Sequence, residues 1–314
     1  MELVTIKKRN SVFAGFKKKV SKSRYLILMG LPAVIFYTIF CYVPMYGILM
    51  AFQKYNIKKG VFGSKFIGFD NFKLIFTEYE DFGRVLGNTV LIGAIKIIIS
   101  FLGAVGVALL LNELRMRRTK KVIQTVVTFP HFLSWVVVAG FVFNLFSSNG
   151  TINNMIASLG GSRKDFLADG KFFMGLIFAS DVWKEAGWGS IVYLATMAGI
   201  PQDQYEAADI DGANRLQKIK HITLPGIKAT AILLLIMSVG GVLSAGFDQI
   251  FNLYNPLVYD YADILDTYIY RQAFGQGSDL GVATAIGLFK SVVSFILVIS
   301  VDRIAKACGE RGII

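Results

Sequence analysis

The segment Glu206-Ala207-Ala208-Asp209-Ile210-Asp211-Gly212 is polar and charged, and it lies between two long apolar runs, residues 172–200 and 229–247. An apolar run of about 20 residues is long enough to cross a bilayer as a helix. The chain therefore leaves the membrane near residue 201 and returns to it near residue 228. A segment held outside the bilayer in this way is expected to contact another molecule, and that contact bears on the function.

Composition places most of the 314-residue chain in a membrane. The mean hydropathy is +0.55 and only 17% of the residues are charged, which is too apolar for an ordinary soluble domain. The apolar runs are continuous rather than alternating, which favours helices over barrel strands. We predict an all-α integral membrane fold with six transmembrane helices. Their predicted ranges are residues 25–52, 85–112, 122–147, 172–200, 229–247 and 281–301.

The net charge of +12 indicates membrane orientation rather than nucleic-acid binding, because of where the basic residues lie. If both termini face the cytoplasm, 20 Lys and Arg residues lie inside and 10 lie in the outer loops. Short basic loops such as 115–121 stay on the cytoplasmic side. The first apolar run is longer than the core of a signal peptide, and no small-residue cleavage site follows it. We therefore predict a retained signal anchor and two cytoplasmic termini.

One membrane domain accounts for most of the chain. We predict a cytoplasmic basic arm at residues 1–24, a six-span domain at 25–304 and a cytoplasmic tail at 305–314. A short amphipathic helix is expected at 152–159, in an outer loop.

The largest cytoplasmic loop, residues 201–228, connects the fourth and fifth spans. Pro201 suits the start of a helix, and we expect a short helix over 204–210. Gly212 allows a bend, and a second helix is expected over 213–222. The loop is thus predicted to be a helix–bend–helix on the membrane surface, a shape suited to a cleft in another protein.

The spacing inside this loop resembles a known signature. Glu-Ala-Ala, three residues, Gly, nine residues, Ile, one residue and Leu-Pro form the EAA motif of the permease subunits of binding-protein-dependent ABC importers. This chain matches the motif without departure, at Glu206, Ala207, Ala208, Gly212, Ile222, Leu224 and Pro225. The flanking Tyr205 and Asp211 resemble the maltose-type carbohydrate branch. Within that branch the chain looks most like the lipoprotein- and polysaccharide-type oligosaccharide permeases.

Weaker matches extend the resemblance over most of the chain, and they are useful only together. They are Asn88-Thr89, Phe129-Pro130, Ser134-Trp135, Gly150, Asn153, Trp183-Lys184 and Tyr268-Ile269-Tyr270-Arg271.

The resemblance implies a mechanical role for the loop. In the family, its short helix docks in a groove of a cytoplasmic ATPase, and closure of two ATPases around ATP turns the permeases from inward-facing to outward-facing. Glu206 is implied to pair with a basic residue of the ATPase, and Gly212 to supply the bend. The implied ATPase-coupling residues are Tyr205, Glu206, Ala207, Ala208, Asp211, Gly212, Leu224 and Pro225. The alternative is a plain surface helix with a favourable Glu near its N-terminus.

The resemblance also implies location and partners. It implies that the chain lies in a bacterial cell membrane, beside a second permease subunit that is expected to be non-identical. Two cytoplasmic ATPase subunits, an extracytoplasmic solute-binding protein and an oligosaccharide substrate complete the set, with lipid around it and no nucleic acid. The chain has no Gly-x-x-x-x-Gly-Lys-Ser/Thr phosphate loop. We therefore expect no enzymatic activity and no cofactor here, with ATP and Mg²⁺ on the partner ATPases and transport by alternating access.

Charged residues inside the predicted spans are the second feature of interest, because each costs about 2.5–3.5 kcal/mol on insertion scales. Asp181, Lys184 and Trp188 recur at helical spacing on one face, with Glu185 beside them. Such side chains suit a sugar site, since aromatic faces cover pyranose rings and charged groups bond hydroxyls. The alternative is an internal ion pair that locks helices together. The substrate-cavity candidates are Asp181, Trp183, Lys184, Glu185, Trp188, Lys290, Asp248 and Gln249.

Other polar residues of the spans have further expected roles. Lys96 or Lys290 could join the ion pair. Asp248, Gln249, Asn252 and Tyr254, at the outer end of the fifth span, could line the outer mouth or contact a binding protein; the alternative is a plain interfacial role. His131 follows a proline, and we expect it to bond a carbonyl that the proline frees. Neither histidine has a Cys or carboxylate cluster at metal spacing, so no metal is expected.

Two rival functions belong to other classes. An ion-coupled secondary transporter or channel would use Asp181, Lys184 and Glu185 as a proton or ion relay. A scaffold would only recruit a cytoplasmic partner. Co-purification of an ATPase with substrate-stimulated hydrolysis would distinguish the importer from both.

Overall fold

The computed structural model describes residues 23–114, 116–275 and 277–307. The predicted basic arm falls almost wholly outside these residues, as does most of the predicted tail. The described chain is helical apart from one small hairpin, in which β1 (Gln53–Lys54) pairs with β2 (Lys65–Phe66). The prediction of an all-α fold is confirmed.

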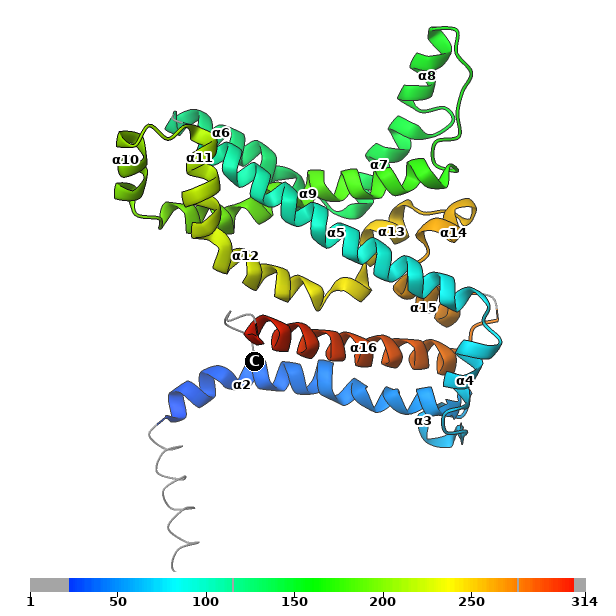
Figure 1. Ribbon diagram of the computed structural model, residues 1–314. Helices are drawn as coiled ribbons and strands as arrows, with labels where there is room; N and C mark the ends of the chain where they lie inside the picture. The colour runs from blue at the N-terminus through cyan, green and yellow to red at the C-terminus, as the bar shows by residue number, and fades with distance from the viewer. Residues whose placement is uncertain (1–22, 115, 276, 308–314) are drawn as a thin grey trace, which may run out of the picture.

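Long helices with roughly aligned axes form the body of the molecule (Figure 1). The first is a continuous rod of α-helix α2 (Arg24–Tyr37), π-helical η1 (Thr38–Tyr42) and 3-10 helical η2 (Val43–Phe52). The other long helices are α5 (Asp81–Asn112), α9 (Gly170–Ala198), α12 (Leu224–Val239) and α16 (Leu280–Ala307).

Five helical stretches of the described residues are long and apolar enough to cross a membrane. They are Arg24–Phe52, Asp81–Asn112, Trp135–Ser158, Arg215–Val239 and Leu280–Ala307. The predicted span at 172–200 corresponds to α9, a 29-residue helix that carries Asp181, Lys184 and Glu185. Length and composition therefore support about five spans, and the predicted count of six is not reproduced.

The predicted third span, residues 122–147, is not one helix. It is divided into α6 (Arg117–Thr128), the 3-10 turn η3 (Phe129–Phe132) and α7 (Trp135–Phe146). Pro130 cannot donate a backbone hydrogen bond, and the Ser134 side chain starts α7 afresh by accepting from Val137 N at 3.3 Å. The proline thus separates two helices instead of kinking one. The predicted amphipathic helix is present as α8 (Thr151–Ser158).

The fifth span begins and ends earlier than predicted. The helix α11 (Arg215–Lys218) continues through the π-helical η4 (Ile219–Thr223) into α12, which ends at Val239. Gly240 and Gly241 then interrupt it, since glycine disfavours continued helix. The short elements η5 (Val242–Ser244) and α13 (Phe247–Leu253) follow. The predicted end at residue 247 was wrong because the two glycines outweigh the apolar character beyond them.

The packing of α5 against α9 forms the centre of the molecule. Small residues allow the two helices to approach closely: a Cβ on Gly189 would lie 3.0 Å from the Cβ of Ala104, and one on Gly103 would lie 3.1 Å from Val182. Ile92, Phe173 and Ile250 are fully buried beside this contact, in a cluster that joins α5, α9 and α13.

The two ends of the helix body carry different structures (Figure 1). At one end lie α10 (Gln202–Ile210) and α11. At the opposite end lie the β1–β2 hairpin with α3 (Gly60–Gly63), then α4 (Asp70–Thr77), η6 (Pro256–Val258), α14 (Tyr259–Ala262) and α15 (Leu265–Phe274).

Candidate coupling surface and translocation site

The helix–bend–helix predicted for residues 201–228 is present, with α10 as its first helix. Pro201 precedes α10, and Gly212 ends it with φ of +75°. Ala213 N donates to Ala208 O at 2.8 Å and Gly212 N to Asp209 O at 3.2 Å, the bonding pattern of a Schellman C-cap. Glycine is favoured at this position because most other L-residues, asparagine excepted, are strained in the left-handed region.

Replacing Gly212 therefore gives a graded test of the bend. Gly212→Val should reduce transport and complex assembly, because a β-branched residue at this φ costs about 1–2 kcal/mol or more. Gly212→Asn is the matched control and should retain most transport, since asparagine tolerates the left-handed conformation. Uptake measured at equal permease levels checks this, and equal loss in both variants would contradict a conformational role.

Two side-chain contacts attach α10 to the helix that follows it. The Tyr205 hydroxyl is 2.9 Å from Oγ1 of Thr223, which is 2% exposed. Lys218 Nζ pairs with Asp209. Because η4 continues into α12, these contacts fix α10 to the N-terminal end of a long helix.

The outer surface of α10 is available for contact. None of its residues is buried. Glu206 is exposed and makes no ion pair with any described residue, and Ile210 is 88% exposed. Leu216 on α11 is 77% exposed. A free carboxylate beside exposed aliphatic side chains is the composition of a docking surface rather than of a solvated helix.

A buried group of polar side chains lies between α5 and α9. Lys96 Nζ is 3.2 Å from Asp181 Oδ1, and Ser100 Oγ donates to Asp181 Oδ2 at 2.7 Å. Lys96 also donates to Oε1 of Gln249, which is fully buried. The Gln249 amide in turn donates to Ile177 O at 2.7 Å and Ser180 Oγ at 2.9 Å. Three helices are thus joined through one lysine.

A second polar group lies further along α9. Lys184 Nζ donates to His131 O at 2.9 Å and lies 3.0 Å from Glu185 Oε1. His131 Nδ1 lies 2.8 Å from Glu185 Oε2, and its ring stacks on Trp188 with centroids 4.4 Å apart. The prediction that His131 bonds a carbonyl freed by the proline is wrong. The His131 ring contacts Glu185, and the backbone carbonyl of His131 accepts from Lys184. Lys184 also lies 5.3 Å from the Trp135 ring centroid.

A cavity of about 520 Å³ connects the two groups. Its polar lining comes from Lys96, Ser100 and Glu185, and Trp188 forms an aromatic wall. Apolar side chains of α12, including Leu234 and Met237, complete it. An open, mostly apolar cavity with a few convergent polar groups is typical of a small-molecule path.

The remaining candidates from the sequence lie elsewhere. Lys290 pairs with Asp266 of α15 at 2.6 Å and does not join the α9 groups. Trp183 is 51% exposed and makes no ring or polar contact with a described residue. Asp248 is exposed, whereas Gln249 is buried and bonds Lys96. The described residues contain no group of three metal-ligating side chains.

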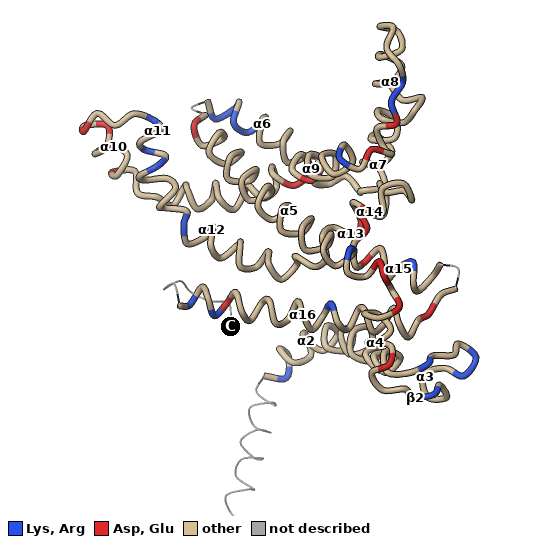
Figure 2. The backbone as a smooth tube through the Cα atoms, turned by 45° about the vertical axis from the view of Figure 1, so that its right-hand side comes forward, with Lys and Arg blue, Asp and Glu red and all other residues tan. Residues whose placement is uncertain are grey.

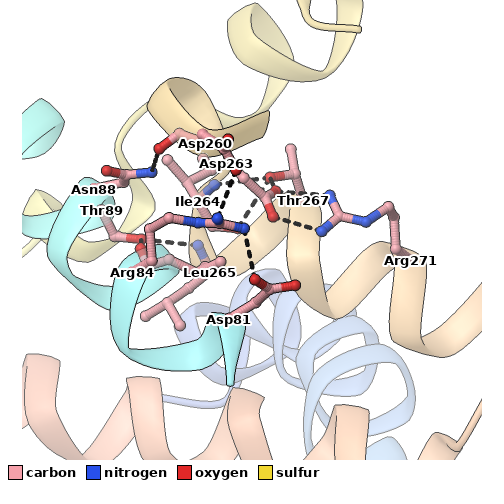
Figure 3. A network of polar contacts seen from close by, with 11 residues as sticks. Asp81, Arg84, Asn88, Thr89, Asp260, Asp263, Ile264, Leu265, Thr267 and Arg271 are labelled. Atoms are coloured by element: carbon pink, nitrogen blue, oxygen red, sulfur yellow. Dashed lines mark hydrogen bonds and ion pairs between the residues drawn. The ribbon is translucent and has the colours of Figure 1, made fainter. Parts of the chain in front are cut away.

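A network at the end opposite α10 joins two of the weaker sequence matches (Figure 3). Arg271 Nη1 donates to Asp263 Oδ1 at 2.7 Å, and Asp263 is 1% exposed. Thr89 Oγ1 accepts from Leu265 N at 2.8 Å, and Asn88 donates to Asp260 O at 3.1 Å. The segment from α14 to α15 is therefore fixed to the start of α5.

Two side chains at this network, Tyr254 and Arg271, have shifted pKa values. Burial raises the pKa of the Tyr254 hydroxyl to about 12, with the nearby Arg271 opposing the shift. Desolvation alone would lower the pKa of Arg271, but the hydrogen bond and charge of Asp263, together with Tyr254, raise it above its ordinary value. The arginine therefore stays charged, and the network is held by a charge-assisted pair.

Comparison with known proteins decides the family. The family of binding-protein-dependent transport system inner membrane components matches residues 104–309. The chain belongs to this family. It is a multi-pass inner-membrane permease subunit of a binding-protein-dependent ABC importer and is not itself an ATPase. This permease identity favours the importer over the ion-coupled and scaffold alternatives.

Relatives match the permease over nearly its full length. Protein LplB of Bacillus subtilis (strain 168) is 41% identical over 295 residues, 94% of this chain and 92% of LplB. The polygalacturonan/rhamnogalacturonan transport system permease protein YteP of the same organism is 41% identical, with the same coverage. A chain in the crystal structure of a bacterial alginate ABC transporter, in complex with an alginate pentasaccharide-bound periplasmic protein, is 38% identical with a TM-score of 0.84. The match covers 94% of the permease and 99% of the chain in that crystal structure.

Proposed function

We propose that this permease carries an oligosaccharide, or a short piece of a polysaccharide, into the cell. A solute-binding protein delivers it from outside, and two ATPases drive transport from the cytoplasm. A second, non-identical permease subunit completes the path. The substrate class is supported by the named substrates of its relatives, polygalacturonan/rhamnogalacturonan and alginate.

The observation that carries the proposal is the α10 surface. It combines Glu206, which forms no ion pair with any described residue, with the exposed Ile210 and the left-handed Gly212, next to the N-terminal end of a continuous helix. We assign α10 as the contact to the ATPase. This assignment places α10 and both termini in the cytoplasm and the β1–β2 hairpin outside. It also counts α9 as a sixth span, with its charges facing polar partners in the molecule instead of lipid.

The α5–α9 cavity is the proposed sugar path. The Lys96–Asp181 pair is assigned a structural role, because both side chains are nearly buried and mutually satisfied. Trp188 and Glu185 are assigned to the substrate, since they line the cavity and remain partly exposed at 46% and 34%. The His131 ring, stacked behind Trp188, holds the indole as a flat platform for a sugar ring.

Trp188→Ala should therefore weaken transport by raising the KM for the binding-protein-delivered sugar about tenfold, a typical contribution of one aromatic platform. Trp183→Ala is the matched control on the same helix and should leave the KM unchanged. Uptake of labelled sugar in cells at varied concentration checks both. Equal effects of the two variants would contradict a specific role for Trp188.

The proposed function as a whole is tested by purification of a tagged permease. A cytoplasmic ATPase and a second permease should co-purify, and ATP hydrolysis should rise when sugar-loaded binding protein is added. Hydrolysis that does not respond to the loaded binding protein would contradict the proposal.

A further inference from the structure

A basic hairpin follows the first rod directly, at the end of the molecule opposite α10. We call residues 53–69 the lysine hairpin: they comprise β1, α3 and β2, and contain Lys54, Lys58, Lys59 and Lys65 with no Asp or Glu. Figure 2 shows these basic residues gathered around α3 and β2. The hairpin therefore presents a local charge of +4 at the membrane boundary, where the rod ends at Phe52.

This charge is not neutralised within the described part of the chain. All four lysines are exposed, and none forms an ion pair with a described residue. Lys54 and Lys65 are direct cross-strand partners. Like charges opposite each other destabilise a strand pair, so the arrangement calls for an anion from outside the chain.

Apolar side chains accompany the lysines. Phe62 is 88% exposed and Ile57 is 74% exposed. The Phe62 ring stacks on Tyr46 of η2, with centroids 5.9 Å apart. Tyr46 lies six residues before the end of the rod, roughly 12 Å along a 3-10 helix axis. Phe62 therefore reaches back along the exposed side of a candidate membrane span, while the lysines remain at its end.

Internal hydrogen bonds hold this shape. The Gln53 amide donates to Val61 O at 2.9 Å, and Ser64 Oγ donates to Gly60 O at 2.6 Å. Asn71, which is buried, donates to Ala51 O and Gln53 O at 2.9 and 3.0 Å. The lysines are thus carried on an ordered scaffold rather than on a free loop.

We propose that the lysine hairpin binds the phosphate headgroups of anionic phospholipids, with the Lys54–Lys65 pair at a phosphate and with Phe62 and Ile57 in the acyl boundary. Lysine beside aromatic and aliphatic side chains is the pattern of a membrane-interface anchor. An acidic protein or an acidic sugar would match the charge but not the exposed Phe62 against the span. The assignment of this lipid to the outer leaflet rests on the orientation given in the proposed function, whereas the lipid contact itself does not.

The test measures retained lipid on the intact transporter complex. The complex is reconstituted in bilayers of equal parts phosphatidylcholine and phosphatidylglycerol, extracted gently, and examined by native mass spectrometry. The wild-type complex should retain phosphatidylglycerol. Lys54→Gln/Lys65→Gln should lower that affinity about thirtyfold, because each lysine near an anionic surface contributes about a factor of five.

Controls separate charge from folding. Lys54→Arg/Lys65→Arg should retain the lipid, and so should Lys73→Gln, which changes an exposed lysine of α4 beside Asp70. A nitroxide on Phe62→Cys, in a background with Cys41 and Cys308 replaced by alanine, should be accessible to oxygen and shielded from a water-soluble nickel reagent.

Three results would overturn the proposal. The first is a glutamine variant that retains as much phosphatidylglycerol as the wild type. The others are a wild-type complex that retains as much phosphatidylcholine as phosphatidylglycerol, or a label at residue 62 that is exposed to water. If the glutamine variant bound the binding protein more weakly in lipid-free detergent, the hairpin would be assigned to a protein partner instead. Lipid retention is measured without sugar, ATP or binding protein. Its failure therefore leaves the proposed import standing, and loss of import leaves the lipid site standing.

Discussion

Glu206→Ala should abolish sugar uptake while the permease still inserts in the membrane at a normal level. The carboxylate is exposed and forms no ion pair with the described residues, and the proposed function assigns its partner to the ATPase. Removing one side of a charge-assisted contact at an interface costs about 2–5 kcal/mol. Coupling should therefore fall by at least tenfold, measured as ATP hydrolysis stimulated by sugar-loaded binding protein and as ATPase retained on the tagged permease.

The control for this variant is Glu113→Ala, at the same end of the molecule. Glu113 is also an exposed carboxylate, but it follows α5 and lies outside α10. Its removal should leave both readings unchanged. Full stimulated hydrolysis in Glu206→Ala would show that α10 does not depend on this carboxylate and would remove the main support for the coupling assignment.

Asp181→Asn should destabilise the permease more than any other single change in the cavity. It removes the carboxylate that neutralises Lys96, which is 8% exposed. Breaking a buried pair by removing one partner costs about 3–5 kcal/mol, because the other charge is left buried. The apparent Tm of the detergent-solubilised complex should fall by about 5–10 °C.

The double variant Lys96→Met/Asp181→Leu distinguishes a structural pair from a sugar contact. If the pair is structural, the double variant should recover much of the lost Tm, since no charge remains buried. Asp248→Asn, which changes an exposed carboxylate at the start of α13, should leave Tm unchanged. An unchanged Tm in Asp181→Asn with a raised KM would instead assign Asp181 to the substrate.

The helix–bend–helix of residues 201–228 could be predicted closely because its signals are local. Pro201 and Gly212 set the limits of α10 through backbone restrictions that operate within a few residues. The predicted helix at 204–210 differs from α10 only at its first residues.

The buried polar groups could not be predicted in the same way. The sequence identifies Asp181 and Lys184 as unusual, but the helix period does not say which span each one faces. Lys96 and Gln249 are far apart in sequence and meet only because α5 and α13 pack on α9. Likewise, the predicted spans extended beyond the helix ends near Pro130 and Gly240. Apolar composition continues there, but proline and glycine interrupt the helix.

The helix from Arg215 to Val239 is continuous, so a movement at one end would be transmitted to the other. It is roughly 35 Å long, so a tilt of 10° about its inner end would move its far end by about 6 Å. That far end leads into Val242, whose carbonyl abuts Gly93 one turn from Lys96. A small rotation of α10 on a partner would thus be magnified and delivered to the wall of the cavity, where a displacement of a few ångströms is enough to open or close a path.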